Sequence, residues 1–278
     1  MTVGRPAPVG PGGLSAAAIV EQIARVDARR RLWFRTLFVA TWLVLIGGLV
    51  LSLIAAQAFD LAFLATWSEF ILLGVPLTIF IAVTSILLAL PFALLGAVGR
   101  LSTLAPLYAS ATLYVSLVRG TPLIVQILFM VLALPQVIPA AAQVPLLALG
   151  IFALGFNYGA YLTEIFRAGI EAVPRGQVEA ATALGMRRRR IMSRIVLPQA
   201  VRIVTPAIGN EFIAMIKDSA LVSIIGIQEL LWRAQRVGSA NFRSLETLVL
   251  AAAVYWALTI VFSLVQERLE QRMARSDR

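Results

Sequence analysis

The stretch EAATALGMRRRRIMSRIVLP, residues 179–198, carries five arginines and lies between two long apolar segments. The residues before Gly185 are good helix formers, and Gly185 can end a helix in the left-handed conformation that most side chains avoid. The pattern predicts a helix, a glycine turn and a second, basic helix that Pro198 ends. The first helix carries a small apolar surface without a membrane span of its own: Ala180, Ala181, Leu184 and Met186. Such a surface favours a groove on another protein.

A simpler interpretation is that this basic segment only fixes the orientation of the chain in a membrane. It suits the arginines at 187–190, because arginine crosses a bilayer at high cost and can contact anionic lipid headgroups. It leaves the apolar surface unexplained. For the arginines both interpretations stay open.

The composition is that of an integral membrane protein. Of 278 residues, 60% are hydrophobic and 14% are charged, and the mean hydropathy is +0.88. A net charge of +10 would favour nucleic acid on a soluble domain. Here the arginines lie in short segments between apolar runs, which is typical of membrane orientation, and we expect no nucleic-acid partner.

Several kinds of chemistry are excluded by the residues that the chain lacks. It has no cysteine and no histidine, so we expect no disulfide, no thiol or histidine catalysis and no metal site. Its only lysine, Lys217, lies in AMIKDSA, which lacks the G-x-x-x-x-G-K-[ST] pattern of a phosphate loop. We therefore expect no catalytic residues, and no ATP hydrolysis by that route.

Six stretches are long enough to cross a bilayer as helices, which takes about 20 apolar residues. They lie near 37–58, 70–98, 112–134, 146–168, 202–226 and 246–266. The stretch 70–98 is over-long and holds Pro76 and Pro91, which predicts a tilt, a kink or an interfacial end. We expect an all-α transmembrane protein with about six spans.

The first 36 residues are predicted to form a tail ahead of the first span. Residues 1–13 are rich in proline and glycine and are expected to be disordered, and a short helix is expected from Leu14 to about Arg31. AQA at 56–58 resembles a signal-peptidase site, but the preceding apolar run exceeds the roughly 7–15 residues of a signal peptide. We therefore predict an uncleaved helix over 37–58.

The arginines also predict the orientation, because cytoplasmic segments carry an excess of basic residues. With the N-terminus inside, twenty of the 24 basic residues fall in cytoplasmic segments, Arg100 and Arg119 among them. Only Arg233, Arg236 and Arg243 fall in outside segments. Both termini, the tail 267–278 and the loop 170–200 are therefore predicted to be cytoplasmic.

The loop also contains a spaced motif: E-A-A at 179–181, Gly185 after three residues, and I-x-L-P at 195–198 after nine more. It resembles the cytoplasmic coupling loop of permeases of ATP-binding-cassette (ABC) importers. Three further stretches resemble the permeases for polar amino acids, of the histidine, glutamine and arginine type: VRGTPLIVQILF (118–129), NYGAYLTEIFRAGIEAVPRGQVEAATALGM (157–186) and LPQAVRIVTPAIGNEFIAMIKDSALVSIIG (197–226). The resemblance runs from about residue 70 to the C-terminus, and the helix at 37–58 departs from it.

The resemblance implies a type I importer permease fold over 70–266, with a five-helix core and one additional N-terminal helix. It implies a transport subunit that is not itself an enzyme and holds no cofactor, in a bacterial plasma (inner) membrane. Its partners would be a second permease copy or a sister permease, two copies of an ATPase that bind ATP and Mg, and an extracytoplasmic amino-acid-binding protein. The residues that it implies at the ATPase joint are Glu179, Ala180, Ala181, Leu184, Gly185 and Met186.

Charged and polar residues within the predicted spans need a partner or a function, because one charge at mid-bilayer costs roughly 2.5–3.5 kcal/mol on insertion scales. On the fifth span, Asn210 and Lys217 share one line of the helix, and Glu211 and Asp218 an adjacent one. The candidates for a substrate path are Asn157, Tyr161, Glu164, Asn210, Glu211, Lys217, Asp218 and Arg119. Glu164 or Glu211 would meet a substrate ammonium, and Lys217 or Arg119 its carboxylate.

Structural alternatives exist for each of these residues. Lys217 with Asp218, and Glu164 with Arg167, would be internal pairs that hold helices in register. Arg119, which we expect at the cytoplasmic start of the third span, would contact headgroups or a partner subunit. For the whole protein, an ion-coupled secondary carrier or a channel also explains the charges, but it leaves the loop 170–200 without a purpose.

Overall fold

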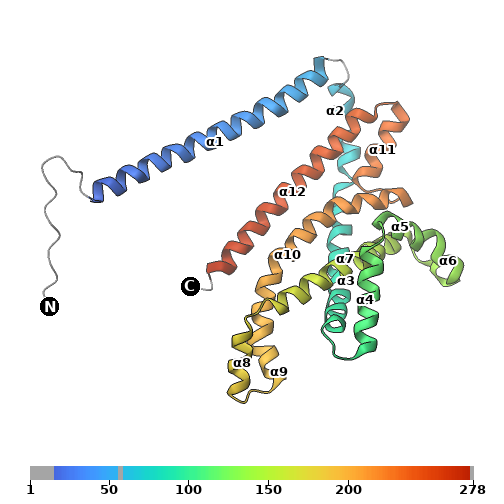
Figure 1. The fold of residues 1–278 in the computed structure, drawn as a ribbon. Helices are drawn as coiled ribbons and strands as arrows, with labels where there is room; N and C mark the ends of the chain where they lie inside the picture. The colour runs from blue at the N-terminus through green and yellow to red at the C-terminus, as the bar shows by residue number, and fades with distance from the viewer. Residues whose placement is uncertain (1–15, 56–58, 276–278) are drawn as a thin grey trace, which may run out of the picture. The chain divides into compact units, whose positions relative to one another are not determined.

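The computed structural model describes residues 16–55 and 59–275, and helices dominate both ranges (Figure 1). The chain divides into two units, Met1–Asp60 and Leu61–Arg278, which are described separately. The predicted disorder at 1–13 and the AQA segment at 56–58 lie outside the described residues. Within these two ranges, five helical stretches are long and apolar enough to cross a membrane, or six if one bent pair counts as a span. The chain is therefore an all-helical integral membrane protein.

The described part of the first unit contains one helix, α1 (Ala16–Ala55). The prediction of a separate short helix ending near Arg31 is wrong, because the helix runs without a break from the basic segment into the apolar one. The reason lies in the sequence, since no proline occurs between residues 16 and 55. The part able to cross a membrane is Val26–Ser52, which begins earlier than the predicted residue 37.

The second unit begins with α2 (Leu61–Leu72) and α3 (Val75–Arg100), which together form one candidate span. A two-residue turn separates them, and Pro76 lies in the first turn of α3, where a helix needs no N–H donor. Pro91 lies inside α3. The over-long stretch predicted at 70–98 is thus a pair of helices that starts nine residues earlier.

The third predicted span, 112–134, is wrong as a single helix. The chain forms α4 (Ala105–Arg119), breaks at residues 120–122, and continues through α5 (Leu123–Leu128), the π-helical turn η1 (Phe129–Ala133) and α6 (Leu134–Val137). The two halves are bent by 105°. Pro122 explains the break, because it has no N–H group and disfavours helical geometry in the residue before it. Arg119 accordingly ends a helix of 15 residues and does not start a span, which corrects its predicted place.

The predicted span at 146–168 corresponds to α7 (Leu146–Glu171), which follows a short 3₁₀ segment, η2 (Pro139–Gln143). A helical hairpin comes next, formed by α8 (Arg175–Ala183) and α9 (Arg188–Ile191). Pro198 does not end the second helix, contrary to prediction. The π-helical turn η3 (Met192–Val196) shifts the hydrogen bonds by one residue just before Pro198, and the helical run continues.

That run continues as α10 (Leu197–Asp218) and the 3₁₀ segment η4 (Ser219–Ile225), so the predicted span at 202–226 begins before residue 202. The segment between the last two predicted spans folds into a helix of its own, α11 (Leu230–Asn241), and α12 (Ser244–Arg275) is the last described element. Glu229 caps α11 by accepting from the Trp232 N–H at 2.8 Å, and its fully buried carboxylate also accepts from Thr78 and Tyr255. One carboxylate therefore ties α11 to α3 and α12.

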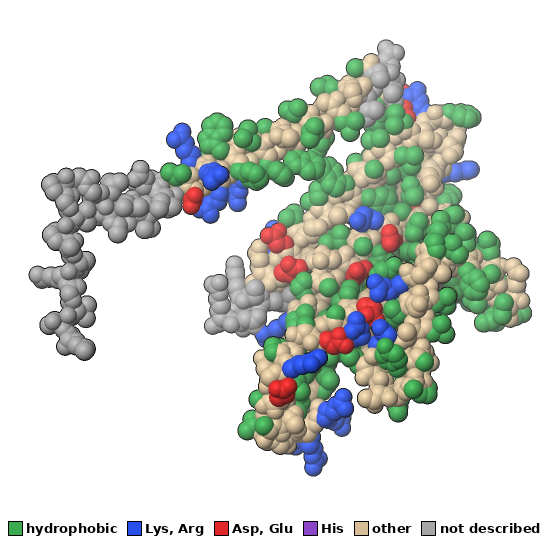
Figure 2. Space-filling model, viewed as in Figure 1, with side chains coloured by type: hydrophobic (Ala, Val, Ile, Leu, Met, Phe, Trp, Pro, Cys, Tyr) green, Lys and Arg blue, Asp and Glu red, His purple; other side chains and the backbone are tan. Residues whose placement is uncertain are grey.

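Small side chains let the central helices approach closely. The main core cluster includes Ala82, Ala89 and Ala93 of α3 and Ala153 of α7, and all four are almost fully buried. Small residues at helix contacts are the usual basis of packing within a membrane, where burial of apolar surface adds little. Charged side chains break the mostly apolar face in Figure 2, where they gather over α7 and the α8–α9 hairpin.

Candidate functional site

A hollow of about 500 Å³ lies where the α4–α5 break meets α7 and α10. Its polar lining comes from each of these elements: Arg119, Thr121, Asn157, Tyr161, Glu211 and Asp218. Three predicted spans thus contribute to it, and five of the eight predicted pathway residues line it. The size suits one small polar molecule.

The break itself follows from three consecutive residues. A side chain at Gly120 would place its Cβ 2.7 Å from the Ser116 carbonyl oxygen, so only glycine fits there without a shift. Thr121 donates its hydroxyl to the Leu117 carbonyl at 2.9 Å, replacing a helical backbone donor. Pro122 has an extended backbone and starts the new helix direction.

The hollow holds one cation opposite two carboxylates. The Arg119 guanidinium lies over the Tyr161 ring, 5.1 Å from its centre, and makes no ion pair within the described residues. Asp218 accepts the Tyr158 hydroxyl at 2.8 Å. Glu211 is half-buried and has no hydrogen-bond partner in the part of the chain that is described. A charged group in a transmembrane helix that lacks a protein partner indicates a ligand or a water-filled path.

Two of the predicted pathway residues lie elsewhere on α10. Asn210 is exposed, and its side-chain oxygen accepts from Gln266 Nε2 of α12 at 3.1 Å. Lys217 is exposed and forms no ion pair within residues 16–55 and 59–275. The alternative of a Lys217–Asp218 pair is therefore not observed, because Asp218 faces Tyr158.

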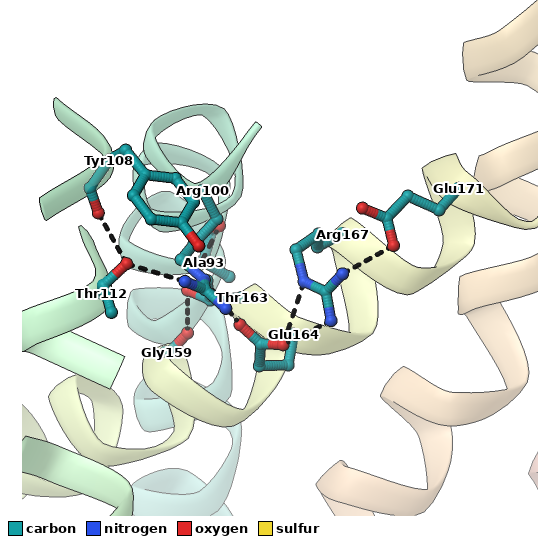
Figure 3. A network of polar contacts seen from close by, with 9 residues as sticks. All are labelled: Ala93, Arg100, Tyr108, Thr112, Gly159, Thr163, Glu164, Arg167 and Glu171. Atoms are coloured by element: carbon teal, nitrogen blue, oxygen red, sulfur yellow. Dashed lines mark hydrogen bonds and ion pairs between the residues drawn. The ribbon is translucent and has the colours of Figure 1, made fainter. Parts of the chain in front are cut away.

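Glu164 is the third predicted pathway residue that lies outside the hollow. It belongs to an ion-pair network at the α3–α7 contact (Figure 3). Its two oxygens lie 3.1 Å from Arg100 Nε and 2.8 Å from Arg167 Nη2. Arg100 also donates to the Thr112 hydroxyl of α4 at 2.7 Å, and Arg167 pairs with Glu171 at 2.6 Å. The predicted Glu164–Arg167 pair is confirmed, and Arg100 joins it from a helix 64 residues away in sequence.

The α8–α9 hairpin contains the predicted coupling residues. Gly185 has a left-handed backbone, with φ +72°, as predicted. Its N–H donates to Thr182 O and the Met186 N–H donates to Ala181 O, which is the hydrogen-bond pattern of a glycine-ended helix. The residue types alone therefore predict this turn correctly.

The apolar side chains of the hairpin divide into two groups. Ala181 is buried and Met186 partly so, and both pack against a cluster that includes Ile191 and Val196. Leu184 is 83% exposed, and Glu179 and Ala180 are exposed beside it. The outward surface is thus smaller than the predicted one, because half of the expected apolar residues hold the hairpin together.

The sequence analysis missed two residues that line the hollow, Thr121 and Tyr158, and a third that contacts the break, Gln126. Thr121 and Gln126 lie within VRGTPLIVQILF, so the signal was present, but the stretch was interpreted as the start of a continuous helix. Tyr158 lies next to the predicted Asn157 on α7. Its partner Asp218 is 60 residues away, and only the packing of α7 against α10 brings them together.

A helical membrane bundle with a broken span, a charged hollow and an exposed helical hairpin has the features of a transport subunit. A family model described as "Binding-protein-dependent transport system inner membrane component" matches residues 90–275. The chain belongs to this family.

Curated relatives agree with the family assignment. The arginine transport system permease protein ArtQ of Bacillus subtilis is 36% identical over 208 residues, which cover 75% of this chain and 94% of ArtQ. The L-cystine transport system permease protein TcyB of the same species is 36% identical over 203 residues, 73% of this chain and 86% of TcyB. These relatives are ABC permease transport subunits.

Solved structures show the same fold. A chain of an amino acid ABC transporter crystallised with histidines superposes with a TM-score of 0.72 at 35% identity, over 77% of this chain and 98% of that one. A chain of the MetNI methionine ABC transporter, in an inward-facing conformation, superposes with a TM-score of 0.58 at 18% identity, over 76% and 96%. The second likeness concerns the fold alone. The fold resembles that of type I ABC importer permeases.

Proposed function

We propose that this chain is the membrane-spanning permease subunit of an ATP-driven, binding-protein-dependent importer of polar amino acids. The observation that carries the proposal is the hollow, which Arg119, Glu211 and Asp218 line together. A free amino acid carries a carboxylate and an ammonium, and both find an opposite charge there. Relatives named as arginine, cystine and glutamine permeases support the substrate class.

The proposed path is narrower than the eight predicted residues. Arg119 meets the substrate carboxylate, Glu211 and Asp218 meet the ammonium, and Asn157 and Tyr161 line the wall. Glu164 is neutralised within the chain, and Asn210 and Lys217 do not line the hollow. In this proposal Glu164 and Asn210 have structural roles, and Lys217 lies outside the path.

The α8–α9 hairpin is the proposed joint to a separate ATPase. The exposed Leu184, with Glu179 and Ala180, supplies a compact surface on a turn that Gly185 and the core of the hairpin keep rigid. Two ATPase copies that bind ATP and Mg, a second copy of this chain or a sister permease, and an extracytoplasmic binding protein complete the transporter. The proposed location of the chain is the bacterial inner membrane, with both termini and the hairpin in the cytoplasm.

The test is ATP turnover of the purified permease–ATPase complex in liposomes, with its binding protein, across the twenty amino acids. Stimulation by one chemical subset of polar amino acids is the expected result and identifies the substrate. A stable complex with an active ATPase that no amino acid stimulates would refute the substrate class and keep the importer architecture.

The joint is tested separately with the double variant Glu179→Ala, Gly185→Val. Valine is strained at φ +72°, so the turn should shift while the spans insert normally. We expect the variant to lose transport, and we expect its ATPase activity to stay at the basal rate when substrate is added. Normal transport by the double variant would refute the assignment of the joint.

An ion-coupled carrier is the alternative that the charges in the spans allow. It predicts that an ionophore abolishes uptake, whereas the importer predicts that loss of the ATPase abolishes it. Family membership favours the importer.

A further inference from the structure

The break between α4 and α5 leaves backbone carbonyl groups that need donors. An unsatisfied carbonyl within a bilayer costs roughly several kcal/mol, so a break in a span persists only where other groups replace the lost bonds. In a continuous helix the Val118 carbonyl would accept from residue 122, but Pro122 has no N–H group. The Leu117 carbonyl is satisfied by Thr121 at 2.9 Å. The Val118 carbonyl needs a donor from further along the chain.

Gln126, in the first turns of α5, supplies that donor. Its Nε2 lies 2.8 Å from the Val118 carbonyl oxygen and 2.8 Å from the Thr121 hydroxyl. The same nitrogen is 3.2 Å from the Thr121 carbonyl oxygen. One side-chain amide therefore joins the last turn of α4 to the break and to α5.

The other end of this amide is also held. Gln126 Oε1 accepts from Asn157 Nδ2 at 3.1 Å, and Asn157 is only 4% exposed on α7. Tyr161 lies one turn further along α7, and its ring carries the Arg119 guanidinium at 5.1 Å. The same helix thus fixes the amide that holds the break and the ring on which Arg119 lies.

We propose that Gln126 is a positioning residue of the translocation site, which keeps the α4–α5 break open and directs Arg119 into the hollow. Arg119 directly follows Val118, so the carbonyl that Gln126 holds sets the direction of the next side chain. The inference rests on the proposed function, in which Arg119 meets the substrate carboxylate. Gln126 does not line the hollow and acts through Arg119.

The first experiment measures binding to the purified permease–ATPase complex without its binding protein, so that only the membrane site discriminates. L-Arginine, L-glutamine and L-glutamate are each compared with their α-amides, which lack the carboxylate. We expect Gln126→Leu to reduce the preference for the free acid about 100-fold, which is the upper range for a hydrogen bond to a charged group. Arg119→Gln should reduce it equally, and the double variant no further, because both changes remove one interaction.

Two variants control for loss of structure. Gln136→Leu removes an exposed amide on α6 that, among the described residues, donates to the Leu132 carbonyl alone, and it should leave the preference unchanged. Gln126→Glu keeps the size of the side chain and the acceptor for Asn157 but removes both donors, so it should reproduce Gln126→Leu. The inference would be overturned if Arg119→Gln loses the preference for the free acid over the amide while either Gln126 variant keeps it in full.

The second experiment measures the labelling rate of a cysteine and therefore needs no substrate. The chain has no cysteine of its own, so an introduced cysteine is the only one in this chain that reacts. Arg119→Cys is labelled with a water-soluble methanethiosulfonate in the presence of Gln126 and in the Gln126→Leu background. We expect labelling to slow about tenfold in the second background as residue 119 leaves the hollow. Equal rates would overturn the inference, whatever the substrate is. If the wild-type complex binds none of the amino acids and the labelling rates still differ, the proposed substrate class fails and the positioning role stands.

Discussion

Two groups of charges lie in the membrane-spanning part of the chain, and they differ in what neutralises them. Around Glu164, two arginines and two carboxylates pair at 2.6–3.1 Å across α3 and α7 (Figure 3). In the hollow, Arg119 makes no ion pair within the described residues, and Glu211 has no hydrogen-bond partner there. Both groups contain the same residue types, so residue type does not distinguish a structural charge from one that serves a ligand.

The difference lies in the helix breaks. Arg100 ends α3 and reaches Glu164 along a continuous, closely packed helix contact. Arg119 ends α4 at a break that turns the chain by 105°, and it lines the hollow together with Glu211 and Asp218 without forming an ion pair among the described residues. A continuous contact allows charges to pair, whereas a break keeps them apart and leaves room for a substrate.

The largest effect is expected for Arg119→Gln. Loss of the guanidinium removes a charge-assisted contact to the substrate carboxylate, so transport should fall about 100-fold, close to 3 kcal/mol. Among the described residues, the folded protein loses the contact with the Tyr161 ring, which contributes at most about 1 kcal/mol. Uptake and unfolding are measured on the same preparation.

The matched control is Arg236→Gln on α11, an exposed arginine that should leave both quantities unchanged. If Arg119→Gln transports normally, the hollow is not the substrate path. If the Arg119→Gln variant unfolds, Arg119 is a structural charge like those around Glu164, and the two groups of charges do not differ in role.

Glu164→Gln tests the other group and should affect stability. Its removal leaves Arg100 and Arg167 without their shared counter-charge at a contact where all three side chains are at most 28% exposed. We expect a loss of roughly 2 kcal/mol in the free energy of unfolding in detergent. Substrate affinity of the surviving complex should stay within about twofold. A stable Glu164→Gln complex that has lost affinity would return Glu164 to the substrate path.

The sequence predicts some of these features and not others, for identifiable reasons. The turn at Gly185 depends on local chemistry, since few other residues adopt φ +72°, and it was predicted correctly. The apolar length of 112–134 suggested one span, because counting apolar residues cannot detect a break that Gly120 and Pro122 cause. In η3, likewise, a π-helical turn lets the helix pass Pro198.

Partners far apart in sequence are the part that sequence reasoning could not supply. Arg100 and Glu164 are separated by 64 residues, and Tyr158 and Asp218 by 60. Helix periodicity places each of these residues on a face but does not say which helix that face meets. Five of the eight pathway candidates line the hollow and three lie outside it, and a substrate role for the five stays a prediction.

The smallest effect is expected for Glu171→Gln, at the outer end of the Glu164 network. Its carboxylate is 53% exposed and pairs with Arg167 four residues earlier on the same helix. Exposed pairs of this kind contribute about 0.3–0.5 kcal/mol, so unfolding should change by no more than that, and transport should not change. Arg167 keeps its bonds to Glu164, which are the ones that join the network across helices. A loss above about 1 kcal/mol would mean that Arg167 needs both carboxylates to stay in place. The network would then act as one unit, and the contrast with the unpaired hollow would be sharper than the separate distances indicate.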